Sequence, residues 1–555
     1  MDNNWFKEMA FYQIWIRSFA DGNGDGIGDL YGVYEKLEYI KSLGIDGIWF
    51  SPIYPSPNAD YGYDVSDYKD IHPDYGDLEQ FKKVLDKAHS LDMKVVMDLV
   101  INHTSDEHFW FRESCKGGDD NPYKDYYIWR DGKVNKDGSI GLPNNWNSLF
   151  EGKAWEYNEE RGQYYLHFFA KKQPDLNMDN PAVREEFKSI MRFWLDMGVD
   201  GFREDSIAFI SKVEGLPNGY PELPMINGLR FAQHGPHIHE YMKEFREVCK
   251  DYDCFQMGEM PMTGPTKAMP YLVGDTKSLD MVITFDYMNA DNFMTDFIRR
   301  PFSPLKYKKA FSKWQKAING KSWNCLYIEN HDHPRVVSRY GSEKLLRESA
   351  TSLATSYIFL QGCPFIYQGQ EIGMTNIRLN SIDKYEDISS KNAYVTFHTG
   401  ESKSKRLYYI GEGSRDSART PMQWSDEKYA GFSKVKPWFY VNPNYRKINV
   451  KSEEKDENSI LNFYRKALAL RKNNDALIWG EFIEHNIDNK YVYTYERRLS
   501  GESFLIICNL TERHLSYKFP DDFRDMNGEL VLTNYDSGHR MDVLRPYECR
   551  VYKYE

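Results

Sequence analysis

The sequence predicts an α/β protein, a (β/α)8 TIM barrel with an inserted loop-rich domain after strand 3 and a C-terminal antiparallel β domain. Eight short apolar runs alternate with helical patterns, and near-continuous apolar strands indicate a parallel sheet buried on both faces. A long aromatic stretch follows the third run, and alternating strand patterns fill the chain beyond about Trp479. A doubly wound open sheet is the alternative, but the sequence lacks a GxGxxG phosphate loop.

The predicted barrel strands are short and rich in β-branched and aromatic residues. They are Phe11–Ile16, Gly47–Pro52, Lys94–Ile101, Asp200–Asp205, Cys254–Glu259, Met281–Asp286, Asn324–Asn330 and Cys363–Gln368.

Capping residues mark the helices between these strands. Asp77 is a candidate N-cap for a helix over Leu78–Leu91, with Gln80 three residues later completing a capping box. Asn180 caps the helix that follows the inserted stretch, with Pro181 at its first position, and Gly198 ends it. The apolar face of that helix is Val183, Phe187, Ile190, Met191, Trp194 and Leu195.

We expect three domains, because the chain is too long for one ordinary core. The barrel is assigned to residues 1–103 and 180–478, the inserted subdomain to 104–179, and a C-terminal β-sandwich to 479–555. Residues from about 375 to 458 are rich in Ser, Asn, Lys and Pro, and we interpret them as a long loop.

Composition excludes several classes of partner. The net charge of −12 and the lack of a basic run disfavour nucleic acids and anionic membranes. No apolar stretch reaches the roughly 20 residues of a membrane span, and no signal-peptide pattern opens the chain. The 7 cysteines are scattered, which is typical of reduced thiols in a cytoplasmic protein. We expect a monomer.

Acidic residues lie at the ends of three of the predicted strands. Asp205 ends the fourth and Glu259 the fifth, while Asp332 follows the seventh. The C-terminal ends of barrel strands form the active site of such folds, so these carboxylates should converge on one pocket. A pair of carboxyl groups is the minimal equipment for cleaving a glycosidic bond.

Further polar residues are expected around these acids. Arg203 shares a strand face with Asp205 and should hold it ionised. His103 ends the third strand region, and Asp60 and Tyr63 follow the second. Each acid alone could be a capping or ion-pair residue, but three at matching strand ends favour a catalytic pocket.

Several motifs carry a resemblance to a known family. The chain resembles the α-amylase superfamily, glycoside hydrolase family 13, and within it the oligo-1,6-glucosidase and α-glucosidase group. The motifs run from Tyr12 to about Asn444, and QPDLN is typical of that group. They are DGNGDGIGDL, SPIYPSPNADYGYD, DLVINHTS, QPDLN, GFREDS, GEM, ENHDHPR, YQGQEIGMTN and SRDSARTPMQW.

The resemblance implies a role for each acid. Asp205 would be the nucleophile, Glu259 the acid/base with a raised pKa, and Asp332 the stabiliser of the transition state. Two displacements would retain the anomeric configuration, with the Asp205 and Glu259 carboxyls roughly 5 Å apart. Phe150 and Phe169 would stack beside the leaving sugar. The released glucose would contact Asp60, Tyr63, His103, Arg203, His331 and Arg419.

A polar loop after the first strand is a candidate metal site. Oxygen ligands at alternate positions suit a hard cation, and relatives with such a loop hold a structural Ca²⁺ or Mg²⁺. The alternative is a polar turn without metal. The candidate ligands are Asp21, Asn23, Asp25, Ile27 and Asp29. No organic cofactor is expected.

Four positions depart from the usual pattern of the group. Ser206 follows the nucleophile, where relatives that prefer α-1,6 bonds usually have Val. Met178 stands where Trp is common, His333 where Gln is frequent, and Gln370 where Glu is frequent. These departures leave the linkage preference open.

The resemblance leaves three functions to weigh. The first is an exo-acting α-glucosidase that releases glucose from short oligosaccharides such as isomaltose, maltose-type oligomers or sucrose. The second is a sucrose isomerase or transglucosidase that uses the same glucosyl-enzyme. The third is a non-catalytic binding protein like the heavy subunits of amino-acid transporters, which the intact triad disfavours.

Overall fold

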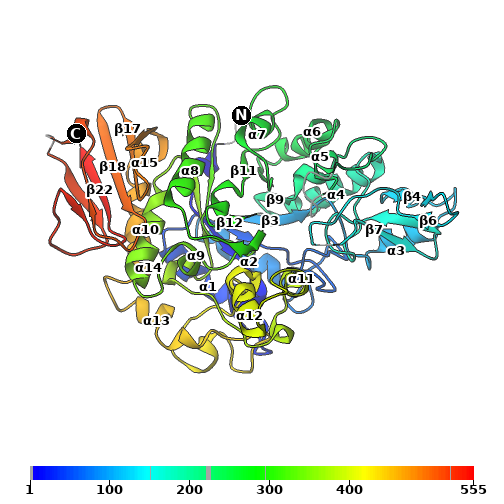
Figure 1. Ribbon diagram of the computed structural model, residues 1–555, viewed down its shortest axis with the longest axis horizontal. Helices are drawn as coiled ribbons and strands as arrows, with labels where there is room; N and C mark the ends of the chain where they lie inside the picture. The colour runs from blue at the N-terminus through cyan, green and yellow to red at the C-terminus, as the bar shows by residue number, and fades with distance from the viewer. Residues whose placement is uncertain (1–3, 151, 221–226, 294, 525–526, 555) are drawn as a thin grey trace.

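The computed structural model describes residues 4–150, 152–220, 227–293, 295–524 and 527–554. The β-barrel occupies the middle of the molecule, with the C-terminal sheet at one end and the inserted segment at the other (Figure 1).

Eight parallel strands form the barrel, in the spatial order β11-β10-β9-β3-β2-β1-β15-β14. The first and last strands of the chain order, β1 and β15, pair with each other, so the ring is closed except between β11 and β14. The predicted fold class is therefore confirmed. The strands are β1 (Phe11–Ile14), β2 (Gly47–Phe50), β3 (Lys94–Val100), β9 (Gly201–Asp205), β10 (Phe255–Glu259), β11 (Met281–Ile283), β14 (Cys325–Leu326) and β15 (Cys363–Tyr367).

Each of the eight strands is shorter than the run predicted for it, and the seventh is shortened most. The seventh run ends as a strand at Leu326, although Tyr327 and Ile328 beyond it are buried. Glu329 then turns to bind Arg335 at 2.6 Å and the backbone N–H of Val336. This buried ion pair draws the chain away from the ladder.

Helices cover the outside of the barrel, and their ends follow the predicted caps. Asp77 accepts a hydrogen bond from the backbone N–H of Gln80, and Asn180 from that of Ala182. Gly198 ends its helix with a φ of 112°. The predicted apolar face of α4 is the face that the structure buries. The helices of this layer are α1 (Leu30–Ser42), α2 (Leu78–Ser90), α4 (Pro181–Met197), α6 (Ile238–Lys250), α7 (Pro265–Leu272), α8 (Pro304–Ile318), α10 (Leu346–Ile358) and α14 (Ile460–Lys472).

The segment between β3 and α4 is a small unit of its own. A three-stranded sheet in the order β4-β8-β7 forms its centre, with α3 (Phe109–Cys115) beside it. A β-bridge between His103 and Asp175 ties the segment back to the end of β3. Its short strands are β4 (Trp129–Arg130), β5 (Lys133–Val134), β6 (Ile140–Gly141), β7 (Trp155–Asn158) and β8 (Gln163–Leu166).

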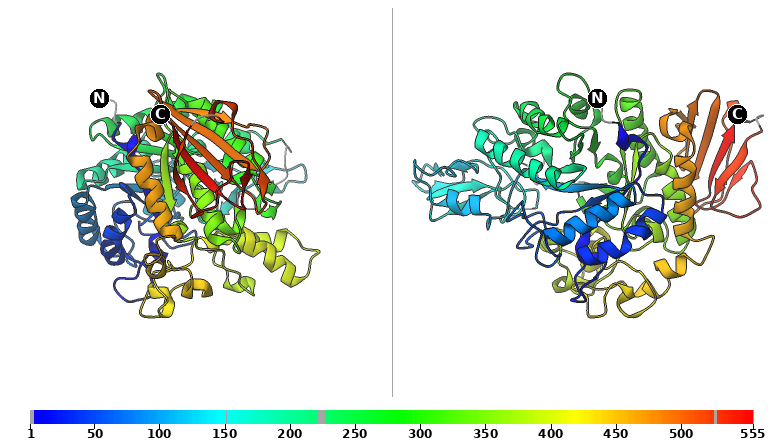
Figure 2. Two further views of the ribbon diagram at one scale, coloured as in Figure 1. Left: turned by 90° about the vertical axis from the view of Figure 1, so that its left-hand side faces the viewer. Right: turned by 180° about the vertical axis from the view of Figure 1, so that it is seen from behind.

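The C-terminal part is an antiparallel sheet of five strands in the order β16-β17-β18-β22-β20. Helix α10 packs against β18 of this sheet, and α14 packs beside α10 (Figure 2). Arg497 on β17 is buried and donates to carbonyl oxygens of Phe359, Leu477, Ile478 and Gly480, which fastens the sheet to the barrel helices. The strands are β16 (Glu481–His485), β17 (Val492–Leu499), β18 (Glu502–Asn509), β20 (Glu529–Thr533) and β22 (Cys549–Tyr554).

The interpretation of residues 375–458 as a long loop is incomplete, because the segment also contains helices. The segment contains α11 (Ile388–Thr396) and α12 (Lys403–Gly413), capped by the side chains of Asp387 and Ser402. Their apolar residues pack with Phe297 of β13 (Thr295–Arg299), which pairs with β12 (Asn292–Phe293). The sequence pattern missed these helices because their apolar faces are narrow and are completed by this distant hairpin.

The expectation that all cysteines are reduced is wrong. Cys249 at the end of α6 and Cys254 before β10 form a disulfide. Their Cα atoms are 4.9 Å apart because the chain reverses between helix and strand. The other cysteines are free and buried.

Among the residues that the structure describes, no helix has the length and apolar character needed to span a membrane.

Candidate active site

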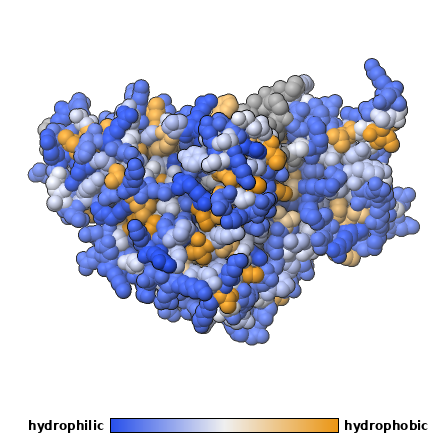
Figure 3. Space-filling model, turned by 60° about the horizontal axis from the view of Figure 1, so that its bottom comes forward, coloured by the Kyte–Doolittle hydropathy of each residue, from blue (hydrophilic) through white to orange (hydrophobic). Residues whose placement is uncertain are grey.

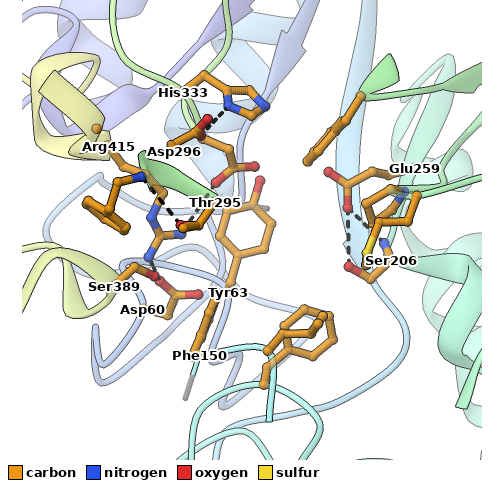
Figure 4. A pocket seen from close by; sticks show the side chains of 18 of the residues that line it. Asp60, Tyr63, Phe150, Ser206, Glu259, Thr295, Asp296, His333, Ser389 and Arg415 are labelled. Carbon is orange, nitrogen blue, oxygen red and sulfur yellow. Dashed lines mark hydrogen bonds and ion pairs between the residues drawn. The ribbon is translucent and has the colours of Figure 1, made fainter. Parts of the chain in front are cut away.

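The C-terminal ends of the barrel strands surround a cavity of about 740 Å³. Asp205 is the last residue of β9 and Glu259 the last of β10, while Asp332 follows β14 in the loop. All three line the cavity, and Figure 4 shows Glu259 beside Ser206. The other lining residues include Asp60, Tyr63, His103, Phe150, Phe169, Gln173, Ser206, Met262, Phe285, Asn289, Asn292, Phe293, Thr295, Asp296, Phe297, His333, Ser389, Phe397 and Arg415.

One buried guanidinium holds the carboxylates together. Arg203 Nη1 lies 2.6 Å from Asp205 Oδ1 and 2.8 Å from Asp98 Oδ1, and Nη2 lies 2.6 Å from Glu259 Oε1. Arg203 and Asp205 thus share a strand face, as the sequence spacing predicts. Because both amino groups of Arg203 are used, Asp205 and Glu259 are fixed next to each other.

Glu259 is arranged to carry a proton near neutral pH. Burial, and then the negative charges of Asp205, Asp332 and Asp98, raise its pKa to about 8 against the opposing charge of Arg203. Ser206 donates two hydrogen bonds to its other oxygen, Oε2, from its backbone N–H and from Oγ, both at 3.2 Å. A protonated carboxyl beside a carboxylate is the pairing that acid catalysis with a nucleophile needs.

Asp332 is held in the opposite charge state. Burial alone would raise its pKa, but the hydrogen bond from His331 and the charges of Arg415 and Arg419 hold the pKa well below its usual range. His331 stacks against Tyr63 with ring centres 5.2 Å apart, which fixes the imidazole edge toward Asp332. Asp332 therefore presents a permanent negative charge to the cavity.

Arg415 cross-links three loops at the cavity wall. Its guanidinium lies 3.0 Å from Asp60 Oδ1, 2.8 Å from Asp387 Oδ1 and 3.4 Å from Asp332 Oδ1. These carboxylates come from the loop after β2, the start of α11 and the loop after β14. The ion pairs join the segment of α11 and α12 to the barrel loops (Figure 4).

Aromatic rings form another part of the wall. Phe169 packs against His103 at 4.9 Å and against Phe150 at 5.7 Å between ring centres. Gln173 Nε2 lies 3.2 Å from His103 Nε2, and burial lowers the pKa of His103, so this imidazole is neutral. Flat aromatic faces beside polar edges are suited to a sugar ring.

Most of the predicted site residues come together here. Asp60, Tyr63, His103, Phe150 and Phe169 line the cavity with the three acids. The predicted contacts Arg203, His331 and Arg419 lie one layer behind it, where each binds a lining carboxylate.

Several lining residues escaped the sequence argument. Arg415 belongs to the SRDSARTPMQW motif and could have been chosen from it. Asp296, Phe293 and Phe297 belong to the β12–β13 hairpin, which carries no motif, and no signal in the sequence points to them. Only the packing of this hairpin on α12 brings them to the cavity.

The candidate metal loop is fastened by its own hydrogen bonds. Asp21 accepts from the N–H groups of Gly24 and Gly26, while Asp29 accepts from that of Asn23 and caps α1. Burial raises the pKa of Asp29. Within the described ranges, no group of three or more His, Cys, Asp or Glu side chains forms a metal cluster. The oxygen donors have the chemistry that a hard cation prefers, and the metal stays a prediction.

Comparisons with known proteins place this site in a family. Residues 13–480 match the alpha amylase catalytic domain. The chain belongs to the α-amylase family. It is similar to an oligo-1,6-glucosidase of Parageobacillus thermoglucosidasius, with 47% identity over 100% of this chain and 99% of the relative.

Solved structures of α-amylase family relatives have the same fold. A trehalose-6-phosphate hydrolase of Bacillus licheniformis is 40% identical, with a TM-score of 0.93 and 99% of each chain covered. An isomaltulose synthase of Klebsiella is 39% identical, with a TM-score of 0.93 and the same coverage. The names of these relatives state different reactions on the same fold.

Proposed function

We propose that this α-amylase family member is a retaining, exo-acting α-glucosidase that releases glucose from the non-reducing end of short oligosaccharides. The observation that carries the proposal is the pairing of Asp205 and a protonated Glu259 on the single guanidinium of Arg203. The similarity to oligo-1,6-glucosidases supports isomaltose-type substrates.

The geometry fits a double displacement. Asp205 attacks the anomeric carbon, and Glu259 gives its proton to the leaving oxygen, so that a glucosyl-enzyme forms and the remaining sugar departs. Glu259, now ionised, takes a proton from water, which attacks the same carbon and frees Asp205. Asp332, held in place by Arg415, would lie beside the positive charge that develops on the ring and stabilise it.

Exo action follows from the cross-link at Arg415. The ion pairs of Arg415 with Asp60, Asp332 and Asp387 close the wall beyond the glucose, so a longer chain cannot pass on that side. The substrate therefore enters with its non-reducing end first. Polymers that need an open groove should be poor substrates.

A neutral leaving group fits this cavity better than a phosphorylated one. Among the described lining residues, Arg415 is the single Arg and no Lys is present. Since Arg415 already binds carboxylates, it has little charge to offer a phosphate. This distinguishes the proposal from the trehalose-6-phosphate hydrolase reaction.

Sucrose isomerisation is the second candidate, because an isomaltulose synthase has the same fold. It differs only in the group that attacks the glucosyl-enzyme, held fructose in place of water. The experiment is product analysis by chromatography after the purified protein acts separately on isomaltose, maltose and sucrose. Glucose release supports the hydrolase, isomaltulose or trehalulose with little free glucose supports the isomerase, and no reaction supports a binding protein.

We propose one structural Ca²⁺ or Mg²⁺ in the loop of Asp21 to Asp29, supported by its oxygen donors. Its function there would be to hold the loop, and no catalytic role is assigned to it. Elemental analysis of the purified protein tests this: absence of metal in a protein of normal thermal stability would contradict it.

We also propose a cytoplasmic monomer. The face in Figure 3 is mostly hydrophilic, with apolar side chains in small groups, which favours a monomer. The disulfide of Cys249 and Cys254 is a point against a reducing compartment. Light scattering tests the monomeric state, and cell fractionation tests the cytoplasmic location.

A further inference from the structure

A histidine next to one of the three acids stands in the cavity wall. His333, directly after Asp332, lines the cavity together with Asp296 from the β12–β13 hairpin. Its Nδ1 lies 2.8 Å from Asp296 Oδ2. Figure 4 shows this pair away from the Ser206–Glu259 pair.

The surroundings of Asp296 determine the tautomer of His333. Arg339 Nη2 lies 2.6 Å from Asp296 Oδ1, and Asn292 Nδ2 lies 2.9 Å from it. Burial would raise the pKa of Asp296, but Arg339 and His333 hold it well below its usual range, so Asp296 is a carboxylate. A carboxylate can only accept, so the shorter contact of His333 Nδ1, the one with Asp296 at 2.8 Å, requires a proton on Nδ1, while Arg339 Nη1 lies farther away, at 3.2 Å.

The other ring nitrogen is left without a partner. His333 Nε2 is buried and makes no hydrogen bond with any described residue, and the ring packs edge-on against Phe285 at 5.0 Å. Buried polar atoms in native proteins nearly always have a partner, supplied by protein, ordered water or ligand. In a cavity wall, a substrate hydroxyl is a natural source of that partner.

The position of His333 assigns it to the leaving sugar. In the proposed function the glucose would lie beside Asp60, Asp332 and Arg415, which are joined to one another by ion pairs. On the hairpin side, the wall around His333 combines Phe285, Phe293 and Phe297 with polar side chains of Asn289, Asn292 and Thr295. Apolar faces with a few polar groups suit a second sugar ring.

We propose that His333 is a specificity-determining residue for the leaving sugar, with Nε2 forming a hydrogen bond with one of its hydroxyls while Asp296 fixes the ring. This inference rests on the glucosidase function proposed above. A Gln at this position could not be bound by Asp296 in the same geometry, because its amide nitrogen and oxygen replace a rigid ring.

The test compares substrates with and without a leaving sugar. We would measure kcat/KM of the wild-type chain, His333→Phe and His333→Gln with isomaltose and with p-nitrophenyl α-glucoside, whose leaving group is no sugar. His333→Phe should lower the isomaltose value by about 10- to 100-fold, the range of one buried hydrogen bond, and the aryl value by less than about threefold. His333→Gln, which also serves if the Phe variant fails to fold, should lower the isomaltose-to-aryl ratio at least about threefold.

The matched control is His237→Phe, at a half-exposed histidine that directly precedes α6 and lies outside the cavity lining. This substitution should leave kcat/KM unchanged for both substrates. An equal loss with both substrates would make His333 merely structural, and no loss with either would leave a water as the partner of Nε2; each overturns the inference. A wild-type protein that hydrolyses neither substrate would instead refute the glucosidase proposal itself.

Discussion

The hydroxyl of Ser206 should set the basic limb of the pH profile. It donates to Glu259 Oε2 at 3.2 Å, and a hydrogen bond to a carboxylate favours the ionised form. Removing it in Ser206→Ala should raise the pKa of Glu259 further above its usual range. In the proposed mechanism Glu259 must be protonated to act first as an acid, so the basic limb of kcat/KM should move to higher pH.

The size of the shift follows from the hydrogen bond. A bond to a charged group contributes about 1.5–3 kcal/mol, and 3.2 Å is long enough to place this one at the lower end. One pKa unit corresponds to about 1.4 kcal/mol, so the expected shift is about one pH unit. The backbone N–H of Ser206 remains, and so do the charged and titratable neighbours of Glu259, which are Arg203, Asp205, Asp98, Asp332 and Tyr327.

The assay is kcat/KM for p-nitrophenyl α-glucoside from about pH 4 to pH 10. Ser206 has a φ of 49°, so Ser206→Gly relieves backbone strain while Ser206→Ala keeps it. Both variants should show the same shift although their thermal stabilities differ. Ser211→Ala, a buried serine on the same loop, is the control and should show none. A basic limb that stays in place, or moves to lower pH, would refute the reasoning.

Other predictions test the remaining parts of the site. Asp205→Asn should abolish turnover while the circular dichroism spectrum stays unchanged. Near-normal activity would contradict the assignment of Asp205 as the nucleophile. Ser206→Val should raise the ratio of kcat/KM for isomaltose to that for maltose. An unchanged ratio would show that the residue at position 206 does not determine the linkage preference. Lys212→Met should lower the free energy of unfolding in urea by about 3 kcal/mol, because it leaves the buried Asp175, 2.8 Å away, without its partner. A loss below about 1 kcal/mol would mean that this carboxylate is otherwise satisfied.

Local patterns in the sequence were sufficient to predict the order of the barrel strands and helices. Apolar runs indicated the strands, and caps such as Asp77 and Asn180 indicated helix starts, because these signals act within a few residues. The three acids could be chosen from the sequence alone because a parallel barrel brings strand ends to one face. The inserted segment and the C-terminal sheet followed from breaks in the alternation.

The other features of the site depended on contacts between distant parts of the chain. Arg415 reaches Asp60 across 355 positions, and Asp296 reaches His333 only because the β12–β13 hairpin packs on α12. Likewise, the sequence gives no sign that Cys249 and Cys254 meet. Side-chain identity and position at the strand ends therefore determined the three candidate acids. Their charge states and the ion-paired wall of the cavity were decided by tertiary packing, because burial and ion pairing between loops exist only once the chain is folded.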